Sequence, residues 1–101
     1  MSYGLTEDYI NLLNAIFKQN SFIEKVVIYG SRAKGNFTER SDIDFVIYGN
    51  LEDRFQISKI KNEIEESSIP YKTDIQMFDD IKNVSLIDHI DRVGKVFYKR
   101  S

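Results

Sequence analysis

The 101-residue sequence contains no cysteine, one proline and one histidine. Without cysteine, disulfides, thiolate metal sites and a cysteine nucleophile are all excluded. A single histidine, His89, also argues against a zinc site built from imidazoles. No apolar run approaches the length of a membrane span, and Met1 to Gly4 lacks a signal-peptide pattern. We therefore expect a cytoplasmic protein with no membrane segment.

Size and charge limit the number of domains and the kinds of partner. With 42% hydrophobic and 13% aromatic residues, the chain has enough apolar side chains for one packed core, and we expect a single domain over residues 1–101. The formal net charge is −2. Because duplex binding draws on a surplus of lysine and arginine, this balance argues against a nucleic-acid partner, although a local basic patch remains compatible with it.

Hydrophobic periodicity predicts helices that alternate with short strands. We expect helices from the Thr6 cap to Asn20, for a turn or two at 31–35, over 53–67 and around 86–93. We expect strands over 25–29, 42–48, 71–78 and 96–98, the last at a sheet edge. The short connections favour an α+β fold in two layers (two-layer α/β), with a small mixed β-sheet and helices packed mainly on one face.

Gly30-Ser31 directly follows the first predicted strand and opens a helical turn. A glycine there lets the backbone approach a ligand closely, and the free N–H groups of a helix start attract phosphate. The Ser31 hydroxyl can add a hydrogen bond to a phosphate oxygen. On its own, the pair also fits a tight strand-to-helix turn in which Ser31 is only a cap. Arg32 and Lys34 follow as candidates for phosphate contact, or as solvated surface residues.

Asp42-Ile43-Asp44 lies inside the second predicted strand. Residues two apart on a strand point the same way, with Cα atoms roughly 6.5–7 Å apart. Two ionised carboxylates in an apolar strand repel each other and resist desolvation. Two Mg²⁺ ions can bridge such a pair and still leave sites for triphosphate oxygens. The alternative is a wet outer face on which the aspartates pair with Arg32, Lys34 or Arg40.

Asp74 supplies a third carboxylate, in the strand predicted over 71–78. If this strand lies beside Asp42 and Asp44, all three carboxylates can meet on one face. Asp74 can then complete the coordination of one metal and help to remove the proton of an incoming hydroxyl. The helix between the two strands makes a parallel pairing reasonable. The alternative is an exposed aspartate beside Lys72 on an edge strand.

The order of these features resembles a known signature. Gly30-Ser31, ten further residues and then Asp42-Ile43-Asp44 are similar to the motif of the DNA polymerase β-like nucleotidyltransferase superfamily. The longer run from Gly30 to Phe45, together with the closing stretch 89–98, resembles its minimal nucleotidyltransferase (MNT) branch. The resemblance implies the nucleotidyltransferase fold over essentially the whole chain.

The resemblance also implies roles for single residues and for cofactors. Its Gly-Ser opens a helix against the triphosphate of ATP, and its paired aspartates hold Mg²⁺, with two ions expected. The expected catalytic and metal-binding residues are Asp42, Asp44 and Asp74. The expected nucleotide-binding residues are Gly30 and Ser31, to which we add Arg32 as a candidate phosphate contact.

The acceptor of the nucleotide is the harder question. Nucleotidyltransferases that act on antibiotics, tRNA ends or primers carry extra domains to hold the acceptor, so we expect another polypeptide, or self-association, to hold it here. The MNT branch is similar to the antitoxin of two-gene modules whose partner, encoded nearby, is an all-helical HEPN-family protein, commonly a toxic ribonuclease. The resemblance implies a protein adenylyltransferase that adds AMP to a tyrosine hydroxyl of that partner and silences it.

Two functions of other classes stay open on the sequence. The chain could neutralise its partner by occlusion alone, as a binding subunit with an unused metal site. It could also transfer a nucleotide to a small molecule or an RNA end, with the partner supplying the acceptor site. An obligatory partner requires an exposed apolar patch, for which Leu86, Ile90 and the stretch 96–98 are candidates.

Overall fold

The computed structural model describes residues 2–100, so Met1 and Ser101, the ends of the expected domain, lie outside the described residues. The elements in chain order are α1 (Glu7–Gln19), β1 (Ile23–Tyr29), α2 (Gly30–Lys34), β2 (Ile43–Gly49), α3 (Phe55–Glu65), β3 (Thr73–Met77), the 3₁₀ helix η1 (Phe78–Asp80), α4 (Val84–Val93) and β4 (Lys95–Lys99). The predicted order of helices and strands is confirmed, and η1 is an addition to it. Within residues 2–100, no helix is long and apolar enough to cross a membrane.

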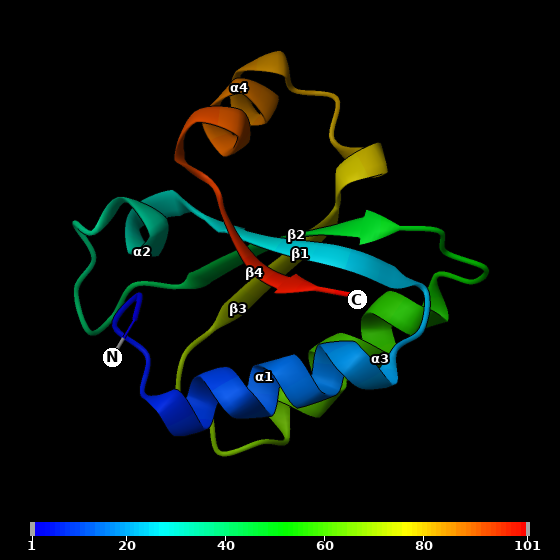
Figure 1. Cartoon of the computed structure of the whole chain (residues 1–101), viewed down its shortest axis with the longest axis horizontal. Coiled ribbons are helices and arrows are strands. Elements are labelled where there is room, and N and C mark those ends of the chain that lie inside the picture. The colour runs from blue at the N-terminus through cyan, green and yellow to red at the C-terminus, as the bar shows by residue number, and fades with distance from the viewer. Residues whose placement is uncertain (1, 101) are drawn as a thin grey trace.

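The four strands form one mixed sheet in the order β3-β2-β1-β4 (Figure 1). β1 runs antiparallel to both of its neighbours, β2 and β4. β2 and β3 run parallel, because α3 connects them and returns the chain to the same end of the sheet. The parallel pairing expected for the strands that carry Asp44 and Asp74 is therefore confirmed.

One face of the sheet is covered by α1 and α3, the two longest helices (Figure 1). Side chains alternate along a strand, and Ile43, Phe45 and Ile47 of β2 all point into this layer. The Phe45 ring packs edge-on against Phe17 of α1, with ring centroids 5.3 Å apart, and lies 4.9 Å from the ring of Phe97. This layer holds the larger part of the core.

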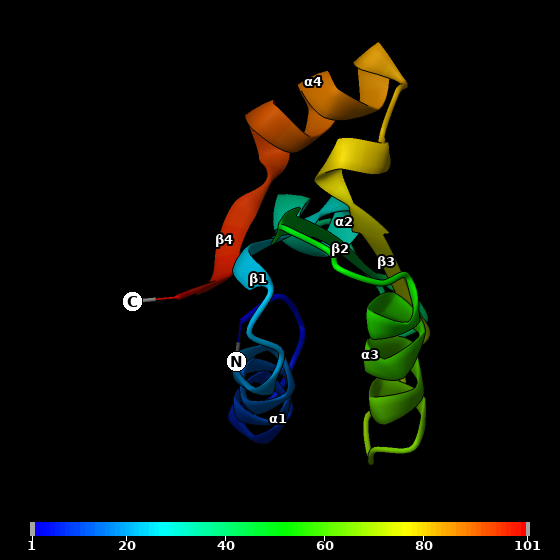
Figure 2. The same cartoon turned by 90° about the vertical axis from the view of Figure 1, so that its right-hand side faces the viewer.

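The opposite face carries a smaller apolar cluster under α4, and Figure 2 shows the sheet between α4 and the α1–α3 pair. Val27, Val46 and Ile90 are buried in this cluster. The α+β class with a mixed sheet is confirmed. The two longest helices share one face as expected, and α4 lies over the other because the apolar side chains of β1 and β2 on that face also need cover. Ile90 is only 3% exposed, so it belongs to this core and not to a surface patch.

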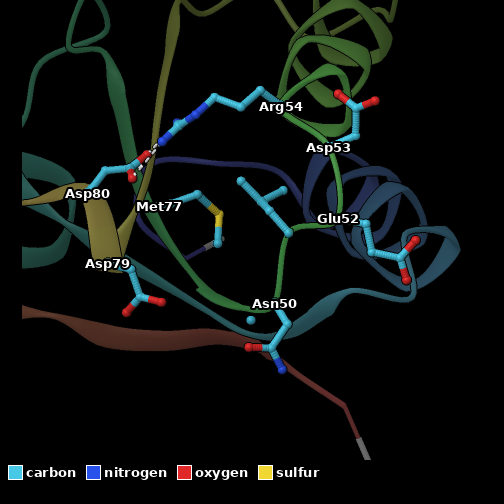
Figure 3. Close-up of a pocket in the computed structure, with 9 residues that line it drawn as sticks. Asn50, Glu52, Asp53, Arg54, Met77, Asp79 and Asp80 are labelled. Carbon is cyan, nitrogen blue, oxygen red and sulfur yellow. Dashed lines mark hydrogen bonds and ion pairs between the residues drawn. The ribbon is translucent and has the colours of Figure 1, made fainter.

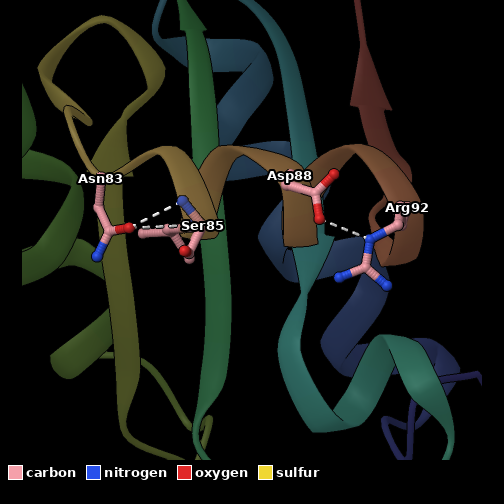
Figure 4. Close-up of polar contacts among 5 residues, drawn as sticks. Asn83, Ser85, Asp88 and Arg92 are labelled. Carbon is pink, nitrogen blue, oxygen red and sulfur yellow. Dashed lines mark hydrogen bonds and ion pairs between the residues drawn. The ribbon is translucent and has the colours of Figure 1, made fainter.

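Local polar contacts define the limits of α4 (Figure 4). The Asn83 side-chain oxygen accepts hydrogen bonds from the backbone N–H groups of Ser85 and Leu86, at 2.9 and 3.3 Å. This satisfies donors that a helix start leaves without partners. Nearer the other end, Arg92 and Asp88 form an ion pair one turn apart, at 2.8 Å.

The aromatic packing of Phe45 predicts a large effect on stability. Phe45 is fully buried and Phe55 is 78% exposed, which makes the two phenylalanines a matched pair. We expect Phe45→Ala to lower the free energy of unfolding by about 3–5 kcal/mol through cavity formation, and Phe55→Ala to change it by less than about 0.5 kcal/mol. Urea denaturation of both variants measures this, and equal effects would contradict the assignment of the core.

Candidate active site

A row of polar side chains crosses three strands on the α4 face of the sheet. In the β1–β2 ladder Tyr29 pairs with Asp44, and in the β2–β3 ladder Asp44 pairs with Asp74. Neighbouring strands lie about 4.8 Å apart, so the two aspartates are adjacent on the same face. The structure therefore brings together two of the three predicted carboxylates by direct strand pairing.

Gly30 directly follows β1 and lies against the carboxylate of Asp44. Its backbone φ is +75°. A Cβ added at this position would overlap Asp44 Oδ2 and would lie 3.2 Å from Asp44 Cγ. Position 30 therefore requires glycine for two reasons, its left-handed backbone and the contact with Asp44. α2 begins at Gly30, so the predicted phosphate-binding turn and the acidic row are in direct contact.

Asp42 lies just before β2 and is exposed. The predicted strand 42–48 thus begins one residue later, because Ile43 is the first residue that pairs with β3. The backbone N–H of Ile43 donates to the Lys72 carbonyl at 2.9 Å, which fixes the start of the strand. Asp42 is near enough to Asp44 for its charge to act on that carboxyl.

Burial and neighbouring negative charge raise the pKa of Asp44 above its ordinary value. Desolvation is the largest cause, followed by the charges of Asp74 and Asp42, while His89 acts in the opposite direction. The ion pairs of residues 2–100 are Arg54–Asp80 and Arg92–Asp88. Neutralisation of the acidic row by Arg32, Lys34 or Arg40, the alternative that the sequence allowed, is therefore not the arrangement in this structure.

Tyr29 is the member of the row that was not among the predicted site residues. Its hydroxyl accepts a hydrogen bond from Gln76 Nε2 at 3.2 Å, and its ring packs edge-on against the His89 ring of α4, with centroids 6.1 Å apart. Burial, with the charges of Asp74 and Asp44, raises the pKa of Tyr29 to about 12. The phenol therefore stays neutral at physiological pH and adds no charge to the site. The period-two alternation of β1, which puts Tyr29 on the face of Val27, could have located it.

Arg32 is not placed as a surface residue of α2. It is only 2% exposed, and its guanidinium donates to the backbone carbonyls of Ser41 and Tyr3. Its expected role as a phosphate contact finds no support in these interactions. Ser31, by contrast, is partly exposed within the first turn of α2, directly after Gly30.

The carboxylate oxygens of Asp42, Asp44 and Asp74 are the kind of donor that a hard divalent cation prefers. Within residues 2–100, no group of three acidic, histidine or cysteine side chains converges closely enough to form a complete metal site. The adjacent carboxylates of Asp44 and Asp74, with Asp42 nearby, still present the oxygen ligands that Mg²⁺ prefers. The absence of a side chain at Gly30 makes room for the Asp44 carboxylate itself. Mg²⁺ usually binds through one or two carboxylates, with phosphates and waters completing its shell.

A hollow of about 350 Å³ lies at the other end of β2 and β3, between Asn50, Arg54, Met77 and η1 (Figure 3). Arg54 spans it to reach Asp80, with which it forms two hydrogen bonds of 2.7 and 2.9 Å. None of the predicted site residues lines this hollow. The acidic row and this hollow are therefore separate features.

The contact between Gly30 and Asp44 predicts a substitution effect that can be isolated. Gly35 also has a positive φ, of +92°, but nothing lies within 4 Å of a Cβ added there. Both Gly→Ala variants should show the left-handed penalty of about 1–2 kcal/mol, and Gly30→Ala should destabilise the fold further. The excess, measured by urea denaturation, should disappear in an Asp44→Ala background. Equal losses for the two single variants would mean that the contact is unimportant.

The raised pKa of Asp44 predicts that the free energy of unfolding of the metal-free protein falls as Asp44 ionises. Because the folded chain binds the Asp44 proton more tightly than the unfolded chain does, ionised Asp44 lowers the free energy of unfolding above its folded pKa. Asp44→Asn should therefore stabilise the protein at pH 7, and the gain should shrink as the pH falls toward about 4. Denaturation in the presence of a chelator measures this. Asp79→Asn, in exposed η1, controls for general loss of negative charge, and an equal gain there would contradict the prediction.

Comparison with known proteins identifies the family. The family model described as polymerase beta, nucleotidyltransferase, matches residues 11–101. A Methanocaldococcus jannaschii protein named "Putative protein adenylyltransferase" is 37% identical over 46 residues, which are 46% of this chain and 44% of that protein. The match therefore spans less than half of that relative.

Solved structures share the fold. A chain in a crystal structure of a toxin–antitoxin pair with AMP-PNP superposes with a TM-score of 0.74 at 16% identity, over 91% of this chain and 74% of that one. A chain in the structure of the tri-AMPylated Shewanella oneidensis HEPN toxin with its MNT antitoxin superposes with a TM-score of 0.70 at 13% identity, over 95% and 74%. With the fold, the Gly30–Asp44 contact and the family match in agreement, the chain belongs to the polymerase beta nucleotidyltransferase family.

Proposed function

We propose that this chain transfers AMP from ATP to a hydroxyl group, and that the acceptor is a tyrosine of a HEPN-family partner protein. The observation that carries the proposal is the in-register pair Asp44–Asp74 in contact with the turn at Gly30. Family membership supports the type of reaction. The AMPylated HEPN toxin in the Shewanella oneidensis complex supports the acceptor, as a property of that protein.

The nucleotide end of the reaction belongs to Gly30 and Ser31. The first backbone N–H groups of α2 have no partner within the helix and attract the phosphates of ATP. Gly30 adds no side chain of its own to this turn, and the side on which a Cβ would lie is occupied by the Asp44 carboxylate. The partly exposed Ser31 hydroxyl adds a donor in the same turn. Their role is to orient the triphosphate so that its α-phosphorus faces the acidic row.

Asp42, Asp44 and Asp74 are the residues that would hold Mg²⁺. When bound, Mg²⁺ neutralises the charge of the triphosphate and lowers the pKa of the attacking hydroxyl. Burial, followed by repulsion from Asp74 and Asp42, raises the pKa of Asp44, and a bound cation would relieve the repulsion. Tyr29 remains a neutral neighbour because its pKa is about 12.

The acceptor end of the reaction belongs to Asp74, which is exposed on the edge strand β3. An acceptor hydroxyl can reach this carboxylate from solvent, and Asp74 takes up its proton. The acceptor oxygen then forms a bond to the α-phosphorus of ATP, while the bond from that phosphorus to the bridging oxygen breaks and pyrophosphate leaves. The products are an AMP ester of the acceptor and pyrophosphate.

The experiment that tests the proposal uses the chain together with the product of the neighbouring reading frame. With ATP and Mg²⁺, we expect the intact mass of the partner to rise by one or more AMP units. Asp44→Asn should abolish this gain, because it removes one of the charges that hold the cation. Asp79→Asn, in the separate hollow near η1, is the matched control and should leave the gain unchanged.

Other results of the same experiment point to the other functions. If masses stay unchanged and an Asp42/Asp44 double variant still neutralises the partner, occlusion replaces catalysis as the function. If labelled AMP appears on RNA or on a small molecule and not on the partner, the reaction stands and the acceptor is wrong. Full partner modification by Asp44→Asn would contradict the assignment of the active site.

A further inference from the structure

Arg32 is a buried cation that forms no ion pair with a carboxylate of residues 2–100. It is 2% exposed, and the ion pairs of residues 2–100 are formed by other arginines. The Arg32 Nε and Nη2 atoms donate to the Ser41 carbonyl at 3.1 and 2.9 Å, and Nη1 donates to the Tyr3 carbonyl at 2.8 Å. A buried charge is tolerated only when such dipoles replace its water.

Two aromatic rings complete this environment. The guanidinium carbon lies 4.3 Å from the centroid of the Tyr71 ring and 5.4 Å from that of Phe37. Arginine stacks well on aromatic faces, and these contacts are stronger when water is excluded. Tyr71 lies just before β3, and Phe37 lies in the loop between α2 and β2. Arg32 therefore joins α2 to three other segments: the N-terminal segment at Tyr3, the loop that contains Phe37 and Ser41, and the segment before β3 at Tyr71.

The Ser41 carbonyl belongs to the planar peptide group that links Ser41 to Asp42. On the other side of Asp42, the next peptide group is held by the hydrogen bond from the Ile43 N–H to the Lys72 carbonyl. Both peptide groups that flank Asp42 thus have a hydrogen-bond partner, one in Arg32 and one in Lys72, which directly precedes β3. The Asp42 side chain itself is exposed, so a free carboxylate stands on an immobilised backbone.

The turn before Asp42 is closed by its own contacts. The Ser41 N–H donates to the Thr38 carbonyl at 3.1 Å, and the Thr38 N–H donates to the Ser41 hydroxyl at 2.9 Å. Residues 38–41 therefore form one hydrogen-bonded turn, and Arg32 joins that turn to α2. Because Arg32 directly follows Ser31, one side chain sets the distance between the phosphate-binding turn and the first carboxylate.

We propose that Arg32 is a positioning residue that holds Asp42 in place for cation binding and does not itself contact the nucleotide. The proposal rests on the proposed function, in which Asp42 is a metal ligand. Lysine cannot replace arginine here, because its single ammonium lacks the planar fork of donors with which the guanidinium reaches both the Ser41 and the Tyr3 carbonyls. Groups that orient metal ligands typically affect metal affinity strongly without touching the metal.

The test measures Mn²⁺ binding by electron paramagnetic resonance, with AMP-PNP present and without turnover. Arg32→Lys should weaken Mn²⁺ binding by roughly tenfold to a hundredfold. Arg40→Lys, at an exposed arginine of the same turn, is the matched control and should change it by less than about twofold. Thermal melting of each variant shows that it is folded.

A double-mutant cycle separates positioning from other effects. If Arg32 acts through Asp42, the effect of Arg32→Lys should largely disappear in an Asp42→Asn background. If Arg32→Lys proves unfolded, Tyr71→Leu removes the aromatic face beneath the guanidinium and leaves Arg32 in place. It should weaken Mn²⁺ binding by a smaller factor, and binding equal to that of the unsubstituted chain would overturn the proposal.

The two proposals fail in different ways. Absence of Mn²⁺ binding by the unsubstituted chain with AMP-PNP overturns the metal assignment, and the role of Arg32 with it. Normal binding by that chain together with undiminished binding by Arg32→Lys overturns the positioning role alone. An equal loss from Arg32→Lys with and without Asp42 also overturns it, because Arg32 would then act independently of that carboxylate.

Discussion

The adjacency of Asp44 and Asp74 on parallel strands is the constraint on which the rest of this structure depends. Their pairing places two carboxylates side by side, and burial with this charge raises the pKa of Asp44. The surroundings accommodate the pair: Gly30 gives up its side chain to make room, and Tyr29 stays neutral beside it. The repulsion between the two carboxylates does not favour folding, and the cation site proposed above accounts for their being kept together.

The placement of positive charge complements this constraint. An arginine paired with Asp42 or Asp44 would cancel the charge that attracts a divalent cation. Arg32, the buried arginine near these residues, instead gives its donors to backbone carbonyls and its faces to aromatic rings. Its donors therefore organise the backbone that leads to Asp42, and the carboxylates stay unpaired with arginine, as the proposed cation site requires. Arg32 thus contributes to packing and to the position of the Ser41–Asp42 backbone without pairing with the carboxylates of the acidic row.

Much of the fold could be predicted, and the failures are instructive. Alternation along β2 puts Phe45 and Asp44 on opposite faces of the strand, and the structure has Phe45 in the main core and Val46, on the face of Asp44, in the smaller cluster. The same rule applied to β1 could have added Tyr29 to the row. Arg32 was expected either to contact phosphate or to be solvated at the surface of a short helix, and both expectations require an accessible side chain. Its burial depends on Tyr3, Ser41 and Tyr71, and no local pattern connects those positions.

By itself the sequence determined the local geometry: the order and type of the helices and strands, which side chains share a strand face, and where glycine permits a left-handed turn. These follow from steric rules that act within a few residues. Only the tertiary structure decided that β3 lies beside β2, that Asp44 contacts Gly30, and that Arg32 is enclosed. Such contacts join segments distant in the chain, and their register is set by how the helices pack on both faces of the sheet, which no short stretch of sequence encodes.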